Sequence, residues 1–232
     1  MTAPAEAATE PAVAAPLLCA TALAKHYGPT TALHDASVRL APGELVAVMG
    51  PSGSGKSTLL HCLAGIVRPD AGTVEYDGRR LDLLSDGERS ALRRTDFGFL
   101  FQFGQLVPEL TCLENVALPL RLSGLRRRPA EAKAREWLER LDAEGTAKQR
   151  PGELSGGQAH RVATARALVT GPRVLFADEP TGALDSLSGE RVLQLIRATA
   201  RETGAAVLLV THDSRVAAYA DREIVVRDGR TR

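Results

Sequence analysis

The chain contains 232 residues, a length that suits one domain of ordinary size or one domain with an inserted subdomain. Its 29 basic and 28 acidic side chains leave a net charge of only +1, which argues against a nucleic-acid-binding protein that works by bulk charge. No apolar run approaches the roughly 18 residues of a membrane span, so action at a membrane would need a partner that supplies the span. The cysteines lack metal-site spacing and are interpreted as reduced thiols of a cytosolic protein.

The first 16 residues are rich in Ala, Pro, Thr and Glu. No basic start precedes an apolar stretch, so this segment is not interpreted as a secretory signal. We predict that residues 1–16 form a disordered tail, with a docking role as the alternative, and that residues 17–232 form the folded domain.

Strand patterns dominate the chain from Leu17 to Met49. Val38 to Leu40 alternates as a half-buried strand does, whereas Leu45 to Met49 is a continuous apolar run. Such a run is typical of a strand that is buried on both faces of a parallel sheet. Two further runs of this kind, Val174 to Ala177 and Val207 to Val210, are separated by helical patterns. The pattern predicts an α/β core with a mainly parallel sheet.

Helical patterns are predicted from Lys56 to Ile66 and, among others, from Ala130 to Leu141. The second of these belongs to a stretch, roughly 95–160, that we interpret as a helical subdomain inserted into the α/β core. Near the end of the chain, Ile224 to Val226 is followed by Asp228 and Gly229, which predicts a short hairpin.

A glycine-rich motif follows the apolar run that ends at Met49. It matches G-x-x-x-x-G-K-[ST] at every fixed position and lies between a predicted strand and a predicted helix, which favours a phosphate-binding loop over a Gly/Ser-rich linker. The glycines let successive backbone N–H groups point inward at phosphate oxygens. Lys56 can reach the β- and γ-phosphates, and the Ser57 hydroxyl can ligate Mg²⁺. The motif consists of Gly50, Pro51, Ser52, Gly53, Ser54, Gly55, Lys56 and Ser57.

Two carboxylates, Asp178 and Glu179, end the apolar run that begins at Val174. Ligands of parallel sheets bind at the carboxyl ends of the strands, so Asp178 is a candidate for holding Mg²⁺, directly or through water. Glu179 is a candidate for orienting the attacking water or accepting its proton. The alternative is that these acids cap the next helix.

A second anion-binding motif is Leu154 to Gln158, with the sequence Leu-Ser-Gly-Gly-Gln. Ser155 is a good N-cap, and Gly156 and Gly157 expose backbone N–H groups at a helix start. One chain with one γ-phosphate has two such helix ends. The simplest geometry therefore directs this second end at the phosphate of a partner subunit.

Taken in chain order, these motifs resemble the ATP-binding subunits of ABC transporters from about Leu17 to the end. The resemblance implies the ABC ATPase fold, a P-loop core with N-terminal antiparallel strands and an inserted helical subdomain. It assigns ATP contacts to Tyr27, Gly50, Pro51, Ser52, Gly53, Ser54, Gly55, Lys56, Ser57, Thr58, Ser155, Gly157, Gln158 and Asp185. It assigns Mg²⁺ contacts to Ser57, Gln102 and Asp178, and catalytic roles to Lys56, Gln102, Glu179 and His212.

The resemblance also gives individual residues their roles. Tyr27 falls where an aromatic ring stacks on adenine, and Gln102 where a glutamine senses Mg²⁺ and contacts the permease side. Ala183 to Asp185 corresponds to a loop that contacts the partner subunit, and His212 to the histidine that contacts the γ-phosphate. Taken singly, Tyr27 could be a packed loop aromatic, Gln102 a surface amide and His212 a hydrogen-bonded core residue.

The function that the resemblance implies is ATP hydrolysis by a homodimer, or by a dimer with a close paralogue. The dimer would drive a separate integral membrane permease at the cytoplasmic face of the cell membrane. A soluble translation-type protein of the family commonly carries two cassettes, and this chain has one. A small-molecule kinase would leave Leu154 to Gln158 without a role. Nucleic acid is not an expected partner.

Within the family, Phe99 to Gln102, Glu114 to Leu120 and Asp178 to Asp185 resemble the lipoprotein-release and macrolide-exporter group (LolD, MacB). This favours export or force transmission. The division protein FtsE is similar too, so a non-transport regulator of an envelope complex is the alternative. The chain departs from the group at Ala159-His160 and at Gly104.

Overall fold

The computed structural model describes residues 15–101, 105–182 and 184–232. The strands are β1 (Leu18–Tyr27), β2 (Thr30–Leu40), β3 (Leu45–Met49), β4 (Ala71–Tyr76), β5 (Arg79–Arg80), β6 (Phe97–Leu100), β7 (Val174–Asp178), β8 (Ala206–Val210), β9 (Arg222–Arg227) and β10 (Arg230–Thr231). The helices are α1 (Lys56–Leu63), α2 (Asp86–Thr95), α3 (Cys112–Leu122), α4 (Arg127–Arg140), α5 (Gly156–Leu168), α6 (Ser186–Thr203) and α7 (Ser214–Ala217). Short 3-10 turns at Glu144–Thr146 and Pro151–Glu153 connect α4 to α5.

The central sheet has six strands in the order β10-β9-β3-β8-β7-β6 and is parallel except for β10. Its middle strands are the predicted apolar runs, and β3, β7 and β8 are buried along almost their whole length. Burial on both faces is what a continuous apolar strand requires. The predicted mainly parallel sheet is therefore confirmed. The predicted terminal hairpin is formed by β9 and β10.

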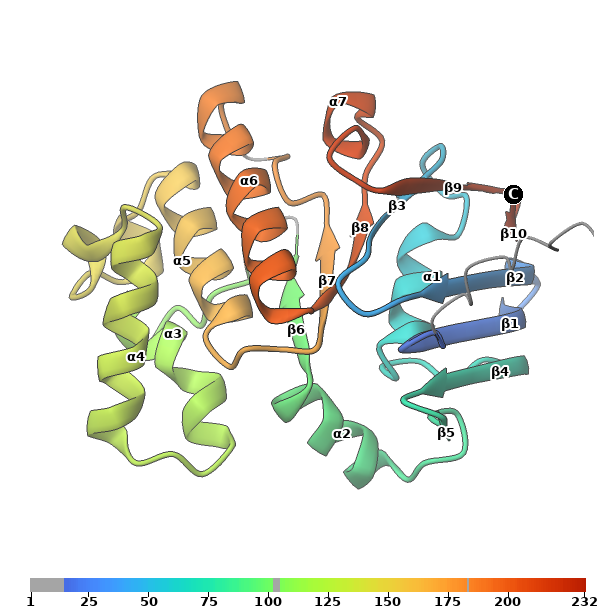
Figure 1. Cartoon of the computed structure of the whole chain (residues 1–232), viewed down its shortest axis with the longest axis horizontal. Coiled ribbons are helices and arrows are strands. Elements are labelled where there is room, and N and C mark those ends of the chain that lie inside the picture. Colours follow the sequence, from blue (N-terminus) through green and yellow to red (C-terminus); the bar gives the residue numbers. More distant parts are fainter. Residues whose placement is uncertain (1–14, 102–104, 183) are drawn as a thin grey trace, which may run out of the picture.

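A second, antiparallel sheet has the order β2-β1-β4-β5. Helix α1 lies between the two sheets, and its buried leucines Leu59, Leu60 and Leu63 join one core with residues of both, including Leu23 and Leu208 (Figure 1). The opposite face of the parallel sheet packs on α5 and α6. The loop that precedes α1 is thus held between two layers.

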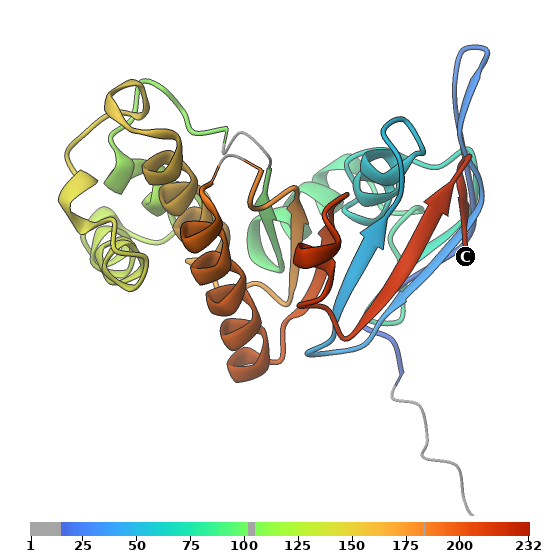
Figure 2. The same ribbon diagram turned by 90° about the horizontal axis from the view of Figure 1, so that it is seen from above.

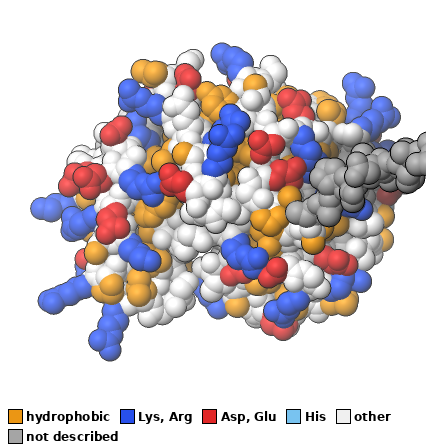
Figure 3. Space-filling view, in the orientation of Figure 1, with side chains coloured by type: hydrophobic (Ala, Val, Ile, Leu, Met, Phe, Trp, Pro, Cys, Tyr) orange, Lys and Arg blue, Asp and Glu red, His pale blue; other side chains and the backbone are white. Residues whose placement is uncertain are grey.

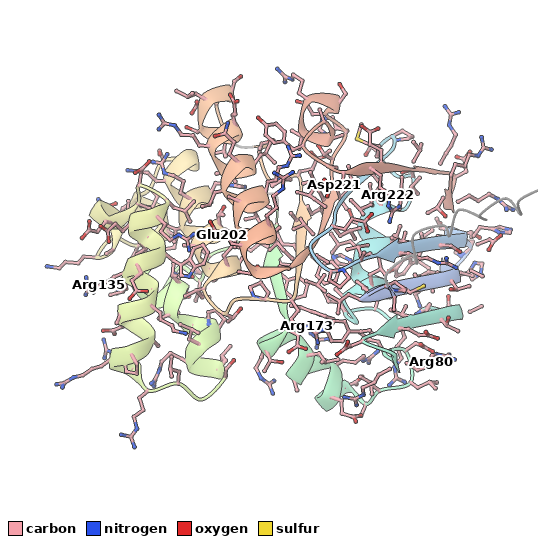
Figure 4. All side chains as sticks on the ribbon, viewed as in Figure 1. Arg80, Arg135, Arg173, Glu202, Asp221 and Arg222 are labelled. Carbon is pink, nitrogen blue, oxygen red and sulfur yellow. The ribbon has the colours of Figure 1, made fainter. Side chains whose placement is uncertain are left out.

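Ion pairs join segments that are distant in the sequence at two places (Figure 4). Arg173, just before β7, reaches Asp77 in the β4–β5 turn with an N–O distance of 2.7 Å. At the start of β9, Arg222 pairs with Glu44 at 2.6 Å, and the neighbouring Asp221 accepts a hydrogen bond from the backbone N–H of Leu45 at 2.9 Å. These exposed pairs are each worth well under about 1 kcal/mol, so the apolar core dominates the stability.

Helices α3, α4 and α5 form a lobe beside the sheets with a buried cluster of its own, including Val116, Leu138 and Val162 (Figure 2). The elements at the two ends of the range 95–160 are shared with the parallel sheet or extend past the range. Phe97–Leu100 is β6, the edge strand of the parallel sheet, and α5 continues to Leu168. A short strand next to a helical stretch has too few residues for its period to be recognised.

Two helix boundaries also differ from the expected ones. Helix α1 ends at Leu63 rather than Ile66, because Gly65 has a φ of 63°, which stops the helix. Helix α4 begins at Arg127, before Pro129 rather than after it. Proline is tolerated in the first turn because N–H groups there have no intrahelical acceptor.

The face seen in Figure 3 carries interspersed acidic and basic side chains with small apolar areas between them. No helix in the described parts of the chain is both long and apolar enough to cross a membrane.

His160, one of the departures from the family group, is buried in α5 with 2% of its surface exposed. Neither ring nitrogen has a hydrogen-bond partner among the described residues. Burial in these surroundings lowers the pKa of His160 from 6.5 to about 4. The ring is therefore neutral at physiological pH and behaves as a packed side chain.

This burial predicts an acid-sensitive fold. Between pH 6.5 and pH 4 the unfolded chain binds a proton at His160 and the folded chain does not, so stability is lost as the pH falls. The loss attributable to this residue approaches roughly 3 kcal/mol. Urea unfolding of His160→Gln should show a weaker pH dependence over this range than the unsubstituted protein. Replacement of the exposed His34 by Gln is the control, and equal pH dependence in all three proteins would contradict the prediction.

Candidate active site

The loop between β3 and α1 has a backbone that only glycine permits at two positions. Gly50 and Gly55 have φ angles of 149° and 105°. A Cβ atom at Gly50 would lie 2.2 Å from the carbonyl oxygen of Val226, and one at Gly55 would lie 2.3 Å from that of Ala32. The loop is therefore pressed against neighbouring backbone and curls tightly into α1. No side chain caps the first N–H groups of this helix, which leaves them available to an anion.

Lys56 and Ser54 of this loop are both expected to contact phosphate, and they differ in their surroundings. Lys56 donates hydrogen bonds from Nζ to the carbonyl oxygens of Gly50 and Pro51, both at 2.8 Å, so its ammonium lies over the loop. The Ser54 hydroxyl is buried and lacks a hydrogen-bond partner among the described residues. A cation and exposed backbone donors that converge on one loop form a binding site for phosphate oxygens.

The loop borders a pocket of about 690 Å³, large enough for a nucleotide. The carboxylates from the end of β7 and the imidazole after β8 lie on its other side. The lining residues are Thr30, Thr31, Ala32, Pro51, Ser52, Gly53, Gly55, Lys56, Ser57, Thr58, Asp178, Glu179 and His212. The structure thus brings most of the predicted loop residues together with the strand-end carboxylates and the histidine, whereas Gly50 and Ser54 of the loop do not line the pocket.

Asp178 accepts a hydrogen bond from the Ser57 hydroxyl at 3.3 Å. Burial raises the pKa of the Asp178 carboxyl above its ordinary value, and the charge of Glu179 raises it further, against the effect of the Ser57 hydrogen bond. A divalent cation at this point would favour the ionised form. In the described parts of the chain, no group of three or more His, Cys, Asp or Glu side chains could hold a metal. One carboxylate and one hydroxyl suit Mg²⁺, which takes its remaining ligands from water and phosphate.

Glu179 has a left-handed backbone, with a φ of 48°. Its Oε1 accepts a hydrogen bond from the backbone N–H of His212 at 3.1 Å and lies 2.5 Å from His212 Nδ1. Its Oε2 accepts a hydrogen bond from the Thr211 hydroxyl at 3.1 Å. Neither Asp178 nor Glu179 caps a helix, so that alternative does not describe these acids.

The second motif forms a complete capping box at the start of α5. Ser155 Oγ accepts a hydrogen bond from the backbone N–H of Gln158 at 3.2 Å, and Gln158 Oε1 accepts one from the backbone N–H of Ser155 at 2.9 Å. Neither residue lines the nucleotide pocket of the same chain. Figure 1 shows the reason, since α1 and α5 lie on either side of strands β6, β7 and β8.

The remaining predicted residues lie apart from the pocket or outside the described residues. Tyr27 ends β1 with 49% of its surface exposed, close to the lining residues Thr30 to Ala32. Asp185 caps α6 by accepting a hydrogen bond from the Ser188 N–H at 3.0 Å, which lowers the pKa of its carboxyl. Gln102 and Ala183 lie outside the described residues.

Sequence reasoning missed Thr211 and the segment Thr30 to Ala32. Thr211 is buried, with 1% of its surface exposed, and in the sequence it resembles a continuation of the apolar run of β8. Its position between a parallel strand and His212 is the feature from which a role near the site could have been predicted. The segment Thr30 to Ala32 belongs to β2 in the other sheet, and nothing in its residue types indicates that it reaches the pocket.

A parallel sheet with a glycine-rich loop before a helix, and with paired carboxylates at a strand end facing that loop, defines a P-loop nucleotide-hydrolysing protein. The sequence profile of the ABC transporter family matches residues 33–182. The chain is 45% identical over 202 residues to the lipoprotein-releasing system ATP-binding protein LolD 2 of Caulobacter vibrioides, and the alignment covers 87% of this chain and 89% of that protein.

Solved structures of ABC transporter cassettes also match this chain. A dimeric structure of the bacterial ABC transporter cassette MJ0796 matches with a TM-score of 0.88 and 40% identity, over 92% of this chain and 96% of that chain. A dimeric post-hydrolysis structure of MJ0796 with ADP and phosphate gives 0.87 and 39%, over the same shares of the two chains. CbiO1 from Clostridium perfringens, part of the ABC transporter complex CbiONQ, gives 0.83 and 29%, over 94% and 87%. The chain belongs to the ABC transporter family and is an ATP-binding, ATP-hydrolysing subunit.

The position of Lys56 predicts the effect of removing its charge. Lys56→Ala should weaken ATP binding by about 1.5–3 kcal/mol, the value of a charge-assisted hydrogen bond, and should abolish hydrolysis. Binding can be followed by calorimetry and turnover by phosphate release. Lys133→Ala, on the exposed surface of α4, is the matched control and should behave like the unsubstituted protein. Normal turnover in Lys56→Ala would show that this ammonium does not hold the phosphates.

Proposed function

We propose that two copies of this chain hydrolyse ATP at shared sites and thereby drive a separate integral membrane permease at the cytoplasmic face of the membrane. One observation carries the proposal. The pocket of a single chain is lined by the phosphate loop, Asp178, Glu179 and His212, whereas the capped end of α5 is remote from it. A second copy of the chain is the simplest source of an α5 end that could cover the open side of this pocket.

The chain's own residues give the nucleotide a fixed place in this proposal. The N–H groups of the loop and the start of α1 surround the phosphates, and the Lys56 ammonium neutralises part of their charge. Tyr27 provides an exposed ring for the adenine at the edge of the pocket. Ser57 and Asp178 would hold Mg²⁺. When bound, Mg²⁺ offsets the charge that develops on the phosphate oxygens.

Glu179 is the proposed acceptor of the proton from the attacking water. Its carboxylate lines the pocket and has hydrogen-bond partners on both oxygens, so it has a definite orientation. His212 lines the same pocket and is proposed to contact the γ-phosphate. Gln102, outside the described residues, is proposed to complete this end of the site.

The partner's copy of the capped α5 end is proposed to close the site over the γ-phosphate. Ser155 and Gly157 lie at a helix start with no acidic residue in the first turn, so the positive end of the helix is not neutralised. The dimeric MJ0796 cassette supports an assembly of this kind. Asp185, at the start of α6, is proposed to lie at the same interface.

The proposal of an export or force-transmitting permease rests on the likeness to LolD 2, a lipoprotein-releasing ATP-binding protein. The proposed docking place for the permease lies beside β6. A groove of about 290 Å³ lies between β6 and α3, with Phe101, Leu118 and Leu122 in its wall. Permease binding there would join the nucleotide site to the helical lobe. Reconstitution with candidate permeases, followed by the ATPase rate, tests this part.

Separation of binding from chemistry gives one prediction. Glu179→Gln keeps the size of the side chain but removes the proton acceptor, so the variant should bind ATP with Mg²⁺, fail to hydrolyse it and accumulate as a dimer. Size-exclusion chromatography with and without ATP measures the dimer. Lys56→Ala/Glu179→Gln is the control and should stay monomeric. Normal hydrolysis without an ATP-dependent dimer would contradict the role given to Glu179.

A shared site gives a second prediction. Ser155→Arg and Lys56→Ala should each abolish hydrolysis alone, because every site in each homodimer is damaged. A mixture of the two forms dimers with one intact site and one doubly damaged site, so partial activity should return. A mixture of Lys56→Ala with the double variant contains no intact site and should stay inactive. Normal hydrolysis by Ser155→Arg alone would contradict the arrangement in trans.

A further inference from the structure

We propose that Thr211 is a positioning residue that holds the carboxylate of Glu179 in the direction needed to accept a proton. The inference rests on the proposed function, because it assumes that Glu179 is the proton acceptor. Thr211 directly follows β8, and Glu179 directly follows β7, the neighbouring parallel strand. The two residues therefore meet at the carboxyl edge of the sheet, where the pocket lies.

The direction of the Thr211 hydrogen bond is fixed by its neighbours. The hydroxyl oxygen accepts a hydrogen bond from the backbone N–H of Asp213 at 3.1 Å. Among the described residues, the other hydrogen-bond partner of this hydroxyl is Glu179 Oε2, at 3.1 Å, which as a carboxylate oxygen can only accept. The hydroxyl hydrogen thus points at Glu179. A hydrogen bond of this kind restricts the direction in which the Glu179 carboxylate faces.

The other partner of this carboxylate is less constrained. The His212 side chain, which faces Oε1, has 72% of its surface exposed, so it retains rotamer freedom. Thr211 is 1% exposed, and its backbone N–H donates to the carbonyl oxygen of Val48 in β3 at 3.1 Å. The threonine is therefore anchored to the strand that leads into the phosphate loop. It can hold Glu179 in place while the histidine ring moves.

The backbone of Glu179 makes such an anchor necessary. A left-handed conformation is disfavoured for residues with a side chain. It is held here by the hydrogen bond from the Glu179 N–H to the carbonyl oxygen of Val210 at 2.8 Å. The backbone hydrogen bond fixes the position of the Glu179 Cα atom, and the Thr211 hydroxyl fixes the position of the carboxylate. Thr211 does not line the nucleotide pocket, so its effect should fall on the chemical step and not on ATP binding.

The test is Thr211→Val, which keeps the shape and removes the hydroxyl, beside Thr211→Ser, which keeps the hydroxyl. Thr211→Val should lower kcat by about ten- to a hundredfold, the effect of losing one hydrogen bond to a charged group, with the KM for ATP unchanged. Thr211→Ser should restore most of kcat, again with the KM for ATP unchanged.

The matched control is Thr199→Val. Thr199 is 5% exposed in α6, and its hydroxyl lacks a partner among the described residues, so the same chemical change should leave kcat unaltered. Thermal unfolding of every variant separates a loss of folded protein from a loss of chemistry. A fall in kcat that only follows the loss of folded protein, or that Thr211→Ser does not reverse, would overturn the role of Thr211.

Glu179→Gln, measured in the same assay, distinguishes the two proposals. If Glu179→Gln is inactive and Thr211→Val keeps the full kcat, the positioning role is wrong and the proposed function stands. If Glu179→Gln hydrolyses ATP normally, the proton-acceptor role fails, and the role of Thr211 fails with it. If both single variants are slow and Thr211→Val causes no further loss in the Glu179→Gln background, the hydroxyl acts through that carboxylate.

Discussion

The close approach of three backbone segments at the phosphate loop is the constraint on which the rest of the structure depends. The carbonyl oxygens of Ala32 in β2 and Val226 in β9 lie only 2.3 and 2.2 Å from where Cβ atoms of Gly55 and Gly50 would be. The N–H of Gly229, in the final hairpin, donates to the Ser54 carbonyl at 3.0 Å. The antiparallel sheet and the terminal hairpin thus enclose the loop from two sides. This explains why segments so distant in sequence belong to one nucleotide site.

The sequence predicts those features in which local chemistry decides the structure. A continuous apolar run such as Leu45–Met49 is removed from water only when both faces of the strand are buried. In the structure this run is β3, an inner strand of the parallel sheet. The loop that begins at Gly50 and the cap at Ser155 were likewise predictable, because each depends on residue types at fixed local spacing.

Features that depend on which strand ends become neighbours could not be predicted in this way. The contact between Thr211 and Glu179 requires β7 and β8 to be adjacent in the sheet, and 32 residues separate the two side chains. The short strand β6 was assigned to the helical lobe because four residues carry no clear period. Thr30 to Ala32 reaches the pocket only through the packing of one sheet against the other.

The capping box of α5 has a consequence for how quickly two copies can recognise one another. The Ser155 hydroxyl oxygen is already engaged by the Gln158 N–H, so the hydroxyl hydrogen is directed away from the helix. Rotamer freedom that would otherwise be lost on association is therefore lost during folding of the single chain. In the proposed dimer, the phosphate would therefore meet a Ser155 side chain whose rotamer is already set. Association of the copies would then require no local refolding at this end of α5.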